Sequence, residues 1–323
     1  MNDTLPHSAY SLFLQSEKEK RVKQALSNIA QKINSSNKEN LSMSLTIKFY
    51  NVEHGSCTHI ITPNGKHILV DVGSKSDKSI VKYIKEKYFP NGGTIDQLII
   101  THPHEDHIWG IPDMYKLGLK PRILQRPINA YDIKPQQNFE PHIEIAKYAN
   151  MMNQEYRSPV SVSDNIEFSN NVGGVDIDIF SAPTASESKD DLNTYSSIVT
   201  IQYCGFKFVL TGDNPSPILR EMIKNNHFVS CIFNATVLLA PHHGRSGEFC
   251  KEFFDIVNPR LSVVSDKSIV HGTQEQTANL YRGRGVQWDM QNRYVFSTRY
   301  DGTTTFTINS NSNWFIDTSK DEY

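Results

Sequence analysis

Apolar and polar residues alternate along much of the chain from residue 44 onward. Leu45, Ile47 and Phe49 stand at every second position, which is the spacing of a strand that buries one face. Comparable short runs predict further strands over residues 58–62, 66–72, 98–100, 175–180, 197–203, 206–210, 236–239, 261–264, 293–298 and 303–309. Helical spacing predicts helices over residues 80–88, 216–224, 248–256 and 273–283. Because strands and helices alternate twice over, we expect an α/β fold with two sheets between layers of helices.

Three stretches depart from this alternation. Residues 1–43 hold a weakly amphipathic helix over 8–34 and a polar linker, so we expect an N-terminal helical arm outside the main domain. Residues 111–160 are interrupted by prolines and predict an insertion of helix and loop. The main domain would span residues 44–310, and residues 311–323 would form a polar, frayed C-terminal tail. The arm either packs on its own domain or contacts a second copy or a protein partner, and the sequence leaves both open.

Composition narrows the class of protein. The 323 residues carry 33 Lys and Arg against 35 Asp and Glu, a formal net charge of -2, which gives no support to a protein that mainly grips long nucleic acid. The four cysteines form no CxxC pair, so we expect free thiols rather than a zinc ribbon. The N-terminus does not resemble a signal peptide, and no apolar run reaches the roughly 18 residues of a membrane helix. We therefore expect a cytoplasmic protein without a membrane segment.

The strongest chemical signal directly follows the apolar strand at 98–100. His102, His104, Asp106 and His107 place three imidazoles and a carboxylate within six residues. Packing alone explains such a run poorly, because each buried imidazole would need its own polar partner. Imidazole and carboxylate are ligands that suit Zn²⁺, Mn²⁺ or iron. His102 and His104 can point the same way along an extended chain, and the other two can reach a second ion nearby.

Two more motifs also follow predicted strands. Asp213 ends the strand at 206–210, where its carboxylate could bridge two cations, although Gly-Asp-Asn is also turn chemistry. His242 and His243 follow the strand at 236–239. One of them can bind a metal and the other can move a proton. The sequence does not determine which does which, and we favour His243 as the ligand and His242 as the catalytic residue. In α/β folds, sites gather at the carboxyl ends of strands, so the three motifs are expected to meet.

Taken in order, these motifs resemble those of the metallo-β-lactamase superfamily, and within it the hydrolase branch of the ComEC-type competence proteins. The resemblance covers about residues 44–310. It rests on Asn51-Val-Glu-His-Gly55, Leu69-Val-Asp-Val-Gly73, the run from Thr101 to Gly110, Ser196-Ser-Ile-Val199, Leu210-Thr-Gly-Asp213, Pro241-His-His-Gly244 and Val270-His271-Gly272. It implies a four-layer αββα sandwich that holds two divalent metal ions, Zn or Mn, with Fe also allowed.

The resemblance also implies roles for single residues. His102 and His104 would bind one ion, Asp106 and His107 the other, Asp213 would bridge them, and His243 or His242 would complete the second ion. Asp106 would also orient the attacking hydroxide. By the same likeness His271 would lie near the site as a further catalytic residue. His54 would line the rim, and Asp71 would brace the histidine loop.

The chain departs from the pattern in two places. Many members carry a histidine just before the strand at 197–203, where this chain has Asn193-Thr-Tyr195-Ser196. The first ion would therefore lack one ligand. Conversely, His104 stands where the competence branch often has aspartate.

The resemblance favours a metal-dependent hydrolase, specifically a phosphodiesterase or nuclease acting on nucleic acid or a nucleotide through a hydroxide activated by two metals. Basic residues of the insertion and of the histidine-pair loop, Lys120, Arg122, Arg126, Lys134 and Arg245, are candidates for phosphate contacts. Two alternatives remain. One is a hydrolase of a small carbonyl compound such as a lactone, thioester or lactam, and the other is a metal-binding regulatory or interaction module without turnover.

Overall fold

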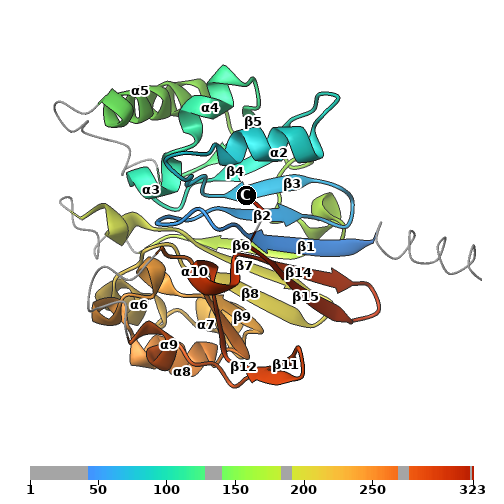
Figure 1. Ribbon diagram of the computed structural model, residues 1–323, viewed down its shortest axis with the longest axis vertical. Coiled ribbons are helices and arrows are strands. Elements are labelled where there is room, and N and C mark those ends of the chain that lie inside the picture. The colour runs from blue at the N-terminus through green and yellow to red at the C-terminus, as the bar shows by residue number, and fades with distance from the viewer. Residues whose placement is uncertain (1–42, 128–139, 183–190, 268–275, 321) are drawn as a thin grey trace, which may run out of the picture. The chain divides into compact units, whose positions relative to one another are not determined.

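The computed structural model describes residues 43–127, 140–182, 191–267, 276–320 and 322–323. Two large sheets lie against each other (Figure 1). The first has the strand order β15-β14-β1-β2-β3-β4-β5. Its strands are β1 (Ser44–Phe49), β2 (Thr58–Ile61), β3 (His67–Val70), β4 (Ile95–Ile99), β5 (Pro121–Gln125), β14 (Thr303–Asn309) and β15 (Trp314–Ser319). Within it β3, β4 and β5 are parallel, and the other pairs are antiparallel.

The second sheet has the order β13-β10-β9-β8-β7-β6. Its strands are β6 (Asp176–Phe180), β7 (Ile198–Tyr203), β8 (Phe206–Leu210), β9 (Val237–Leu239), β10 (Leu261–Val264) and β13 (Val295–Ser297). Strands β8, β9, β10 and β13 run parallel, so their carboxyl ends lie at one edge of the sheet. A small hairpin of β11 (Val286–Trp288) and β12 (Gln291–Arg293) stands apart from both sheets.

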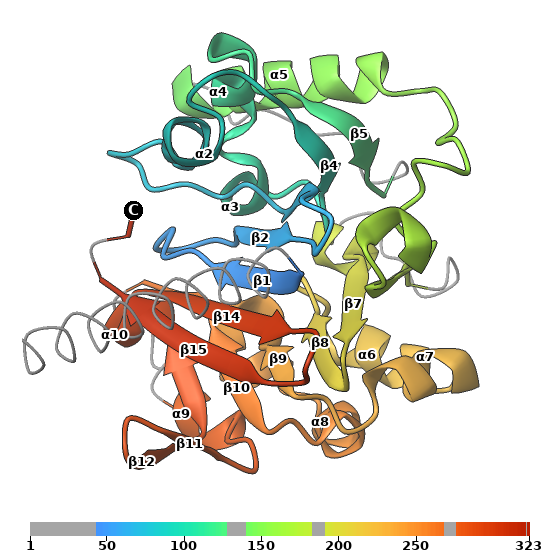
Figure 2. The ribbon, with the colours of Figure 1, turned by 90° about the vertical axis from the view of Figure 1, so that its right-hand side faces the viewer.

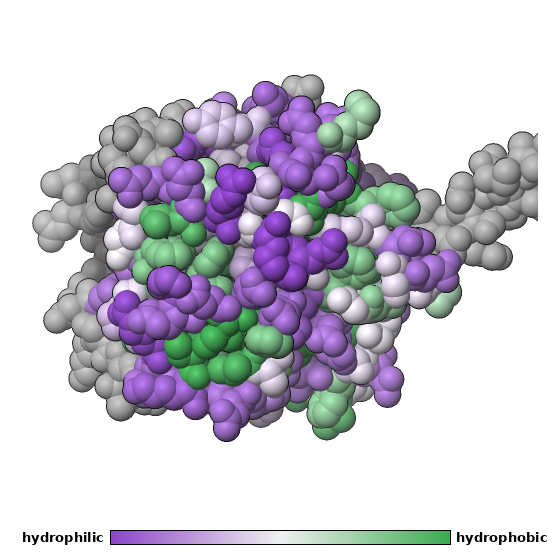
Figure 3. Space-filling model, turned by 90° about the horizontal axis from the view of Figure 1, so that it is seen from below, coloured by the Kyte–Doolittle hydropathy of each residue, from purple (hydrophilic) through white to green (hydrophobic). Residues whose placement is uncertain are grey.

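Helices cover the outer face of each sheet (Figure 2). The first layer consists of α2 (Ile80–Tyr88), α3 (Glu105–Ile108), α4 (Ile111–Lys116) and α5 (Glu140–Glu155). The second consists of α6 (Ser216–Met222), α7 (Asn226–Ile232), α8 (Lys251–Val257) and α9 (Thr277–Leu280), with α10 (Thr298–Asp301) beside β13 and β14. Seen from below, on the side of this second layer, the surface is largely hydrophilic, with a few hydrophobic patches (Figure 3). No helix among the described residues is long and apolar enough to cross a membrane.

The alternation of the strands explains the layers. Leu45, Ile47 and Phe49 of β1 all join a core of buried residues between the two sheets. A second buried core lies between the first sheet and its helices and includes Leu69, Leu98 and Ile108, and a third lies between the second sheet and its helices. Burying apolar faces on both sides of each sheet drives this arrangement. The expected αββα sandwich is confirmed.

Several local predictions need correction. Residues 121–125, read as part of a loop insertion, form β5, because the parallel pairing with β4 supplies hydrogen bonds that no local pattern reveals. The short helix α7 was also missed. Residues 314–319 form β15 against β14, and Tyr323 is buried, so the prediction of a frayed tail is wrong. Partner strands order this polar segment. The predicted arm at 1–43 lies outside the described residues apart from Met43.

Candidate metal centre

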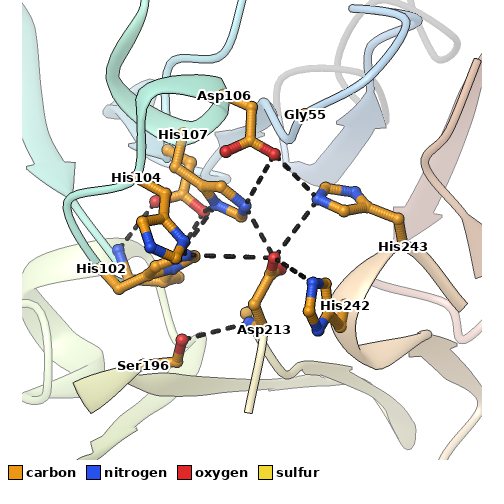
Figure 4. Close-up of polar contacts among 12 residues, drawn as sticks. Gly55, His102, His104, Asp106, His107, Ser196, Asp213, His242 and His243 are labelled. Carbon is orange, nitrogen blue, oxygen red and sulfur yellow. Dashed lines mark hydrogen bonds and ion pairs between the residues drawn. The ribbon is translucent and has the colours of Figure 1, made fainter. Parts of the chain in front are cut away.

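Each of the three sequence motifs follows the carboxyl end of a parallel strand. The run from His102 to His107 follows β4, Asp213 follows β8, and the pair His242 and His243 follows β9. Because these ends face one another across the two sheets, the motifs converge at one place (Figure 4). The convergence expected from the sequence is present.

Four of the predicted donors form a tight group made of Asp106, His107, Asp213 and His243, whose donor atoms lie within 4.8 Å of one another. Nε2 of His243 is 3.1 Å from Oδ2 of Asp106 and 3.4 Å from Oδ2 of Asp213. Nε2 of His107 is 3.2 Å from Oδ1 of Asp213 and 3.8 Å from Oδ2 of Asp106. Of the histidine pair, His243 and not His242 belongs to this group.

The two remaining predicted donors lie on the other side of Asp213. Nε2 of His102 is 3.0 Å from Nδ1 of His104 and 4.0 Å from Oδ2 of Asp213. His102 is fully buried, whereas His104 is partly exposed. No imidazole stands at residues 193–196, where Ser196 instead accepts a hydrogen bond from the backbone N–H of Asp213 through its Oγ at 3.2 Å. Asp213 thus lies between a group with three further donors and a group with two.

Two of the imidazoles are held by acceptors behind them. Nδ1 of His107 lies 2.7 Å from Oδ2 of Asp71, and Asp71 also accepts hydrogen bonds from the backbone N–H and the hydroxyl of Thr101. Nδ1 of His243 lies 2.8 Å from the carbonyl oxygen of Ser265. Such acceptors fix the proton on Nδ1 and leave the Nε2 lone pair directed at the cluster. The predicted bracing role of Asp71 matches this geometry.

The backbone around the site is constrained at several points. His242 and His243 both have left-handed backbone angles, with φ of 47° and 54°, which non-glycine residues adopt rarely and near functional sites. The carbonyl oxygen of Asp106 fits against two glycines. A Cβ on Gly55 would meet that oxygen at 2.3 Å, and a Cβ on Gly73 at 2.2 Å. The glycines therefore allow the loops after β1 and β3 to clamp the loop that carries the ligands.

The electrostatics of the cluster favour cations. Burial alone would lower the pKa of His107, but the carboxylates of Asp213, Asp71 and Asp106 outweigh it and hold the pKa well above its usual range. For His243 the same balance of burial against Asp213 and Asp106 raises the pKa to about 10. Burial would raise the pKa of Asp213, yet His243 and His107 hold it well below its usual range. In the absence of metal, protons on two imidazoles compensate the carboxylates.

His242 and His271 were the other predicted catalytic residues. His242 is half-buried, with its Nε2 3.8 Å from Oδ2 of Asp213 and its Nδ1 4.0 Å from Oε1 of Glu248. Burial lowers the pKa of this ring. His271 lies outside the described residues.

His54, which the resemblance places at the rim, lies beside the cluster, and the structure adds Asp266 and Arg299, which the sequence did not single out. His54 lies with its Nε2 3.5 Å from Oδ2 of Asp106 and its Nδ1 3.2 Å from Oδ1 of the buried Asp266. Asp266 in turn pairs with Arg299 at 2.9 Å. The pairing joins the first turn of the domain to the loop after β10, so no local pattern could reveal it. A cleft of about 360 Å³ opens beside Asp106 and His54 and is also lined by Lys267.

The predicted basic residues of the insertion are engaged elsewhere. Lys120 pairs with Glu155 at 2.9 Å, and Arg122 pairs with Asp164 at 2.8 Å. Arg126 donates to the carbonyl oxygen of Tyr156 and to other groups. Lys134 lies outside the described residues. Of the five candidates, Arg245 remains beside the histidine pair.

The donor geometry fits a metal ion. Four ligands about 2.1 Å from a tetrahedral ion lie about 3.4 Å apart, and the four nitrogen-to-oxygen distances of the tight group run from 3.1 to 3.8 Å. Nε2 of His107 is buried and, although close to Asp213, has no hydrogen-bond geometry with any described partner. A cation would satisfy it. The cluster can therefore hold a divalent metal, and the pair His102 and His104 could contribute to a second ion that shares Asp213.

Part of the chain is similar to a known sequence family, and several solved structures are similar to the chain. A sequence model described as the metallo-beta-lactamase superfamily matches residues 51–183. The metallo-beta-lactamase fold protein YhfI from Bacillus subtilis is similar in structure, at 13% identity and a TM-score of 0.45 over 82% of this chain and 99% of that one. Unliganded yeast PDE1 is similar at 13% identity and a TM-score of 0.44, over 81% of this chain and 99% of that one. A diphosphatase of the PhnP family is similar at 12% identity and a TM-score of 0.43, over 83% of this chain and 100% of that one.

A search of curated protein sequences finds no match. The sequence model spans the loop after β3, which carries Asp71, and the whole run from His102 to His107. Over these residues the chain is similar in sequence to the metallo-β-lactamase superfamily.

Proposed function

We propose that the chain is a metal-dependent hydrolase that cleaves phosphodiesters of a nucleotide or a nucleic acid. The observation that carries the proposal is the position of Asp213 between two sets of donors. One set consists of Asp106, His107 and His243, and the other consists of His102 and His104. Two divalent cations held in this way would lower the pKa of a shared water towards neutral and bind the oxygens of a phosphoryl group.

The protein's own residues hold and orient these groups. Asp71 and the Ser265 carbonyl fix the rings of His107 and His243, so the lone pairs need no reorientation before metal or substrate arrives. The carboxylate of Asp106 faces the cleft and can orient an attacking water. The resemblance to the hydrolase branch of the ComEC-type competence proteins supports attack at a phosphorus rather than at a carbonyl carbon.

His242 is suited to deliver a proton to the leaving oxygen. It is half-buried beside Asp213 and its buried Nδ1 has no hydrogen-bond partner among the described residues. Its lowered pKa makes the protonated ring a strong donor that is sparsely populated at neutral pH. Activity that depends on this proton should therefore fall as the pH rises.

The charges around the cleft favour a small or short phosphodiester. Lys120, Arg122 and Arg126 bind other groups, whereas Lys267 lines the cleft and Arg245 follows the histidine pair. A polymer would need several basic contacts along its backbone, and its binding would weaken steeply with salt.

The test compares substrates on the metal-loaded full chain. A generic phosphodiester, a lactone and single-stranded DNA are each supplied with Zn²⁺ or Mn²⁺. We expect turnover of the phosphodiester, and we expect Asp213→Asn to reduce it at least about 100-fold because the shared ligand is lost. Asp164→Asn removes a partly exposed carboxylate paired with Arg122 and serves as the matched control, with turnover unchanged.

Turnover of the lactone alone would contradict the proposal in favour of a carbonyl hydrolase. Full metal loading without turnover of any substrate would contradict it in favour of a regulatory module. Turnover of DNA that falls steeply with ionic strength would keep the chemistry but reject the small substrate.

The role of His242 is tested with leaving groups. His242→Ala should slow hydrolysis of an alkyl phosphodiester roughly 100-fold or more, within the usual range for general acids. A p-nitrophenyl ester needs no proton on its leaving oxygen, so the variant should hydrolyse it at nearly the original rate. An equal loss for both esters would show that His242 acts in another way.

A further inference from the structure

A second cluster of metal-binding side chains lies away from the centre described above. Asp178 of β6 and two residues of α7, His227 and Cys231, place one carboxylate oxygen, one imidazole nitrogen and one sulfur within 4.8 Å of one another. β6 is an edge strand of the second sheet, and α7 belongs to the helical layer on its outer face. None of these residues takes part in the proposed hydrolysis.

The sequence places the three side chains on one surface. In β6, Ile177 points into the core between the sheets while Phe180 packs against the second helical layer, so Asp178 faces the helices by alternation. In α7, Phe228 and Ile232 are buried against the same layer. His227 and Cys231 are four residues apart and therefore share the adjacent helix face.

The distances match those of a tetrahedral site with a thiolate ligand. Bonds of about 2.3 Å to sulfur and about 2.1 Å to nitrogen or oxygen place each such pair about 3.6 Å apart around Zn²⁺. Sγ of Cys231 lies 3.6 Å from Oδ2 of Asp178 and 3.9 Å from Nδ1 of His227. A thiol at this separation makes weak hydrogen bonds to the carboxylate and the imidazole, and the same separations fit a shared cation.

The surrounding charges are compatible with a cation. Lys207 is a positive group close to Cys231, and its Nζ donates to the carbonyl oxygens of Ser230 and Phe233 at 3.0 Å each. Burial and the neighbouring Asp178 raise the pKa of the Cys231 thiol, so the metal-free site carries a proton on sulfur. A metal ion would displace that proton and form a thiolate, which is the form that binds Zn²⁺ strongly.

We propose that Asp178, His227 and Cys231 bind a thiophilic divalent cation such as Zn²⁺, with a fourth position open to water or to a ligand from another molecule. The ion joins the edge strand β6 to helix α7. Three protein ligands with one open position distinguish it from a closed structural zinc site.

Cobalt gives a readout that is specific to this site. A thiolate bound to Co²⁺ produces a near-ultraviolet charge-transfer band, and the donors assigned to the main centre include no sulfur. We expect the full chain to develop this band on titration with Co²⁺ and to lose it in Cys231→Ser. Cys204→Ser changes another partly exposed cysteine, which belongs to neither metal cluster of the described residues, and should keep the band.

Affinity and stoichiometry give a second test. His227→Ala and Asp178→Asn should weaken Co²⁺ binding at this site at least about tenfold, and Cys231→Ser should bind one equivalent of Zn²⁺ fewer than Cys204→Ser. All three ligands are exposed or half-buried, so the variants should fold, which circular dichroism checks. Absence of the band at saturating Co²⁺, or its persistence in Cys231→Ser, would overturn the proposal without bearing on the hydrolase.

Discussion

Asp71 shows how one buried residue can determine the behaviour of its neighbours. It lies at the end of β3 with a left-handed backbone, φ 59°, and accepts hydrogen bonds from Thr101 at both oxygens as well as facing Nδ1 of His107. Burial raises the pKa of its carboxyl group, although His107 and Thr101 oppose that effect. The residue binds no metal itself and instead determines how His107 presents its lone pair.

Asp71→Asn is expected to lower metal affinity by about 10- to 100-fold while leaving the fold intact. The amide can accept from only one side, so it cannot serve both the Thr101 N–H and the His107 ring. Competition with a chromogenic chelator measures the affinity. Asp317→Asn, an exposed change on β15, is the control, and equal affinities in the two variants would rule out the bracing role.

Metal affinity should increase with pH. Burial lowers the pKa of His243, but Asp213 and Asp106 outweigh it and raise it to about 10, so in the metal-free protein its proton must leave before a metal binds. Each displaced proton makes the affinity rise about tenfold per pH unit until that pKa is reached. The raised pKa also means that the proton on His243 stabilises the metal-free fold. This stabilisation is complete below the pKa of unfolded histidine, near 6.5, and is lost as the pH rises through about 10.

Zn²⁺ titrations between pH 6 and 8 test this dependence. An affinity that does not change with pH would show that His243 is not protonated in the metal-free state.

At the level of elements, the loops rather than the helices hold the ligand run in place. The backbone N–H of Ser56 donates to the carbonyl oxygen of Asp106, and that of Val72 donates to the carbonyl oxygen of His107. From the other sheet, Ser265 holds the carbonyl oxygen of Gly55 through its hydroxyl at 2.8 Å. The short helix α3 is therefore positioned by contacts from two loops of its own sheet.

Gly55→Ala should disturb this arrangement. The new methyl group would meet the carbonyl oxygen of Asp106 at 2.3 Å. The backbone of Gly55 also has a φ of 130°, which residues with a side chain rarely adopt. Gly65→Ala is a matched control because its φ is 79° but nothing lies within 4 Å. We expect the control to be destabilised by about 1–2 kcal/mol. Gly55→Ala should be destabilised by more than the control and should also bind metal more weakly. Similar melting temperatures and affinities for the two variants would contradict the clamp.

For the molecule as a whole, Glu322 connects two layers of the fold. Its Oε1 lies 2.7 Å from Nζ of Lys48 on β1 and 2.5 Å from Nζ of Lys87 on α2, and Tyr83 donates to the same oxygen. Tyr323 next to it packs against the ring of Tyr83. The segment after β15 thus joins the first sheet to its helices.

This link predicts a loss of stability in acid. Burial would raise the pKa of Glu322, but the two lysines and Tyr83 outweigh it and lower the pKa to about 2. A lowered carboxyl pKa stabilises the fold above the unfolded value near 4.5, and this stability is lost as the pH falls through about 2. After allowance for solvent screening the contribution is about 1–2 kcal/mol.

Urea unfolding at pH 7 and pH 3 measures the contribution of Glu322 to the free energy of unfolding. Glu322→Gln should lose stability at pH 7 and show a smaller acid dependence, whereas Asp317→Asn should behave like the parent chain. An unchanged acid dependence in Glu322→Gln would refute the link.

The sequence by itself determined the class of fold and the set of ligand-bearing loops. Alternating apolar residues in short runs, and helical spacing between them, are local signals because each residue's burial follows its position in a strand or helix. The sequence therefore predicted which strand ends carry the candidate ligands, and the order of these motifs along the chain carried the family resemblance. These ligands are His102, His104, Asp106, His107, Asp213 and the pair His242 and His243.

Only the tertiary structure decided which atoms meet. Whether His243 or His242 joins Asp106 depends on a left-handed backbone that the two residues share, and this follows from contacts rather than from local preference. The same holds for β5 and β15, which gain their hydrogen bonds from partner strands, and for the approach of His54 to Asp266 across 212 residues. Contacts between distant segments leave no periodic trace in the chain, so long-range pairing of donors and charges is visible only once the sheets have packed.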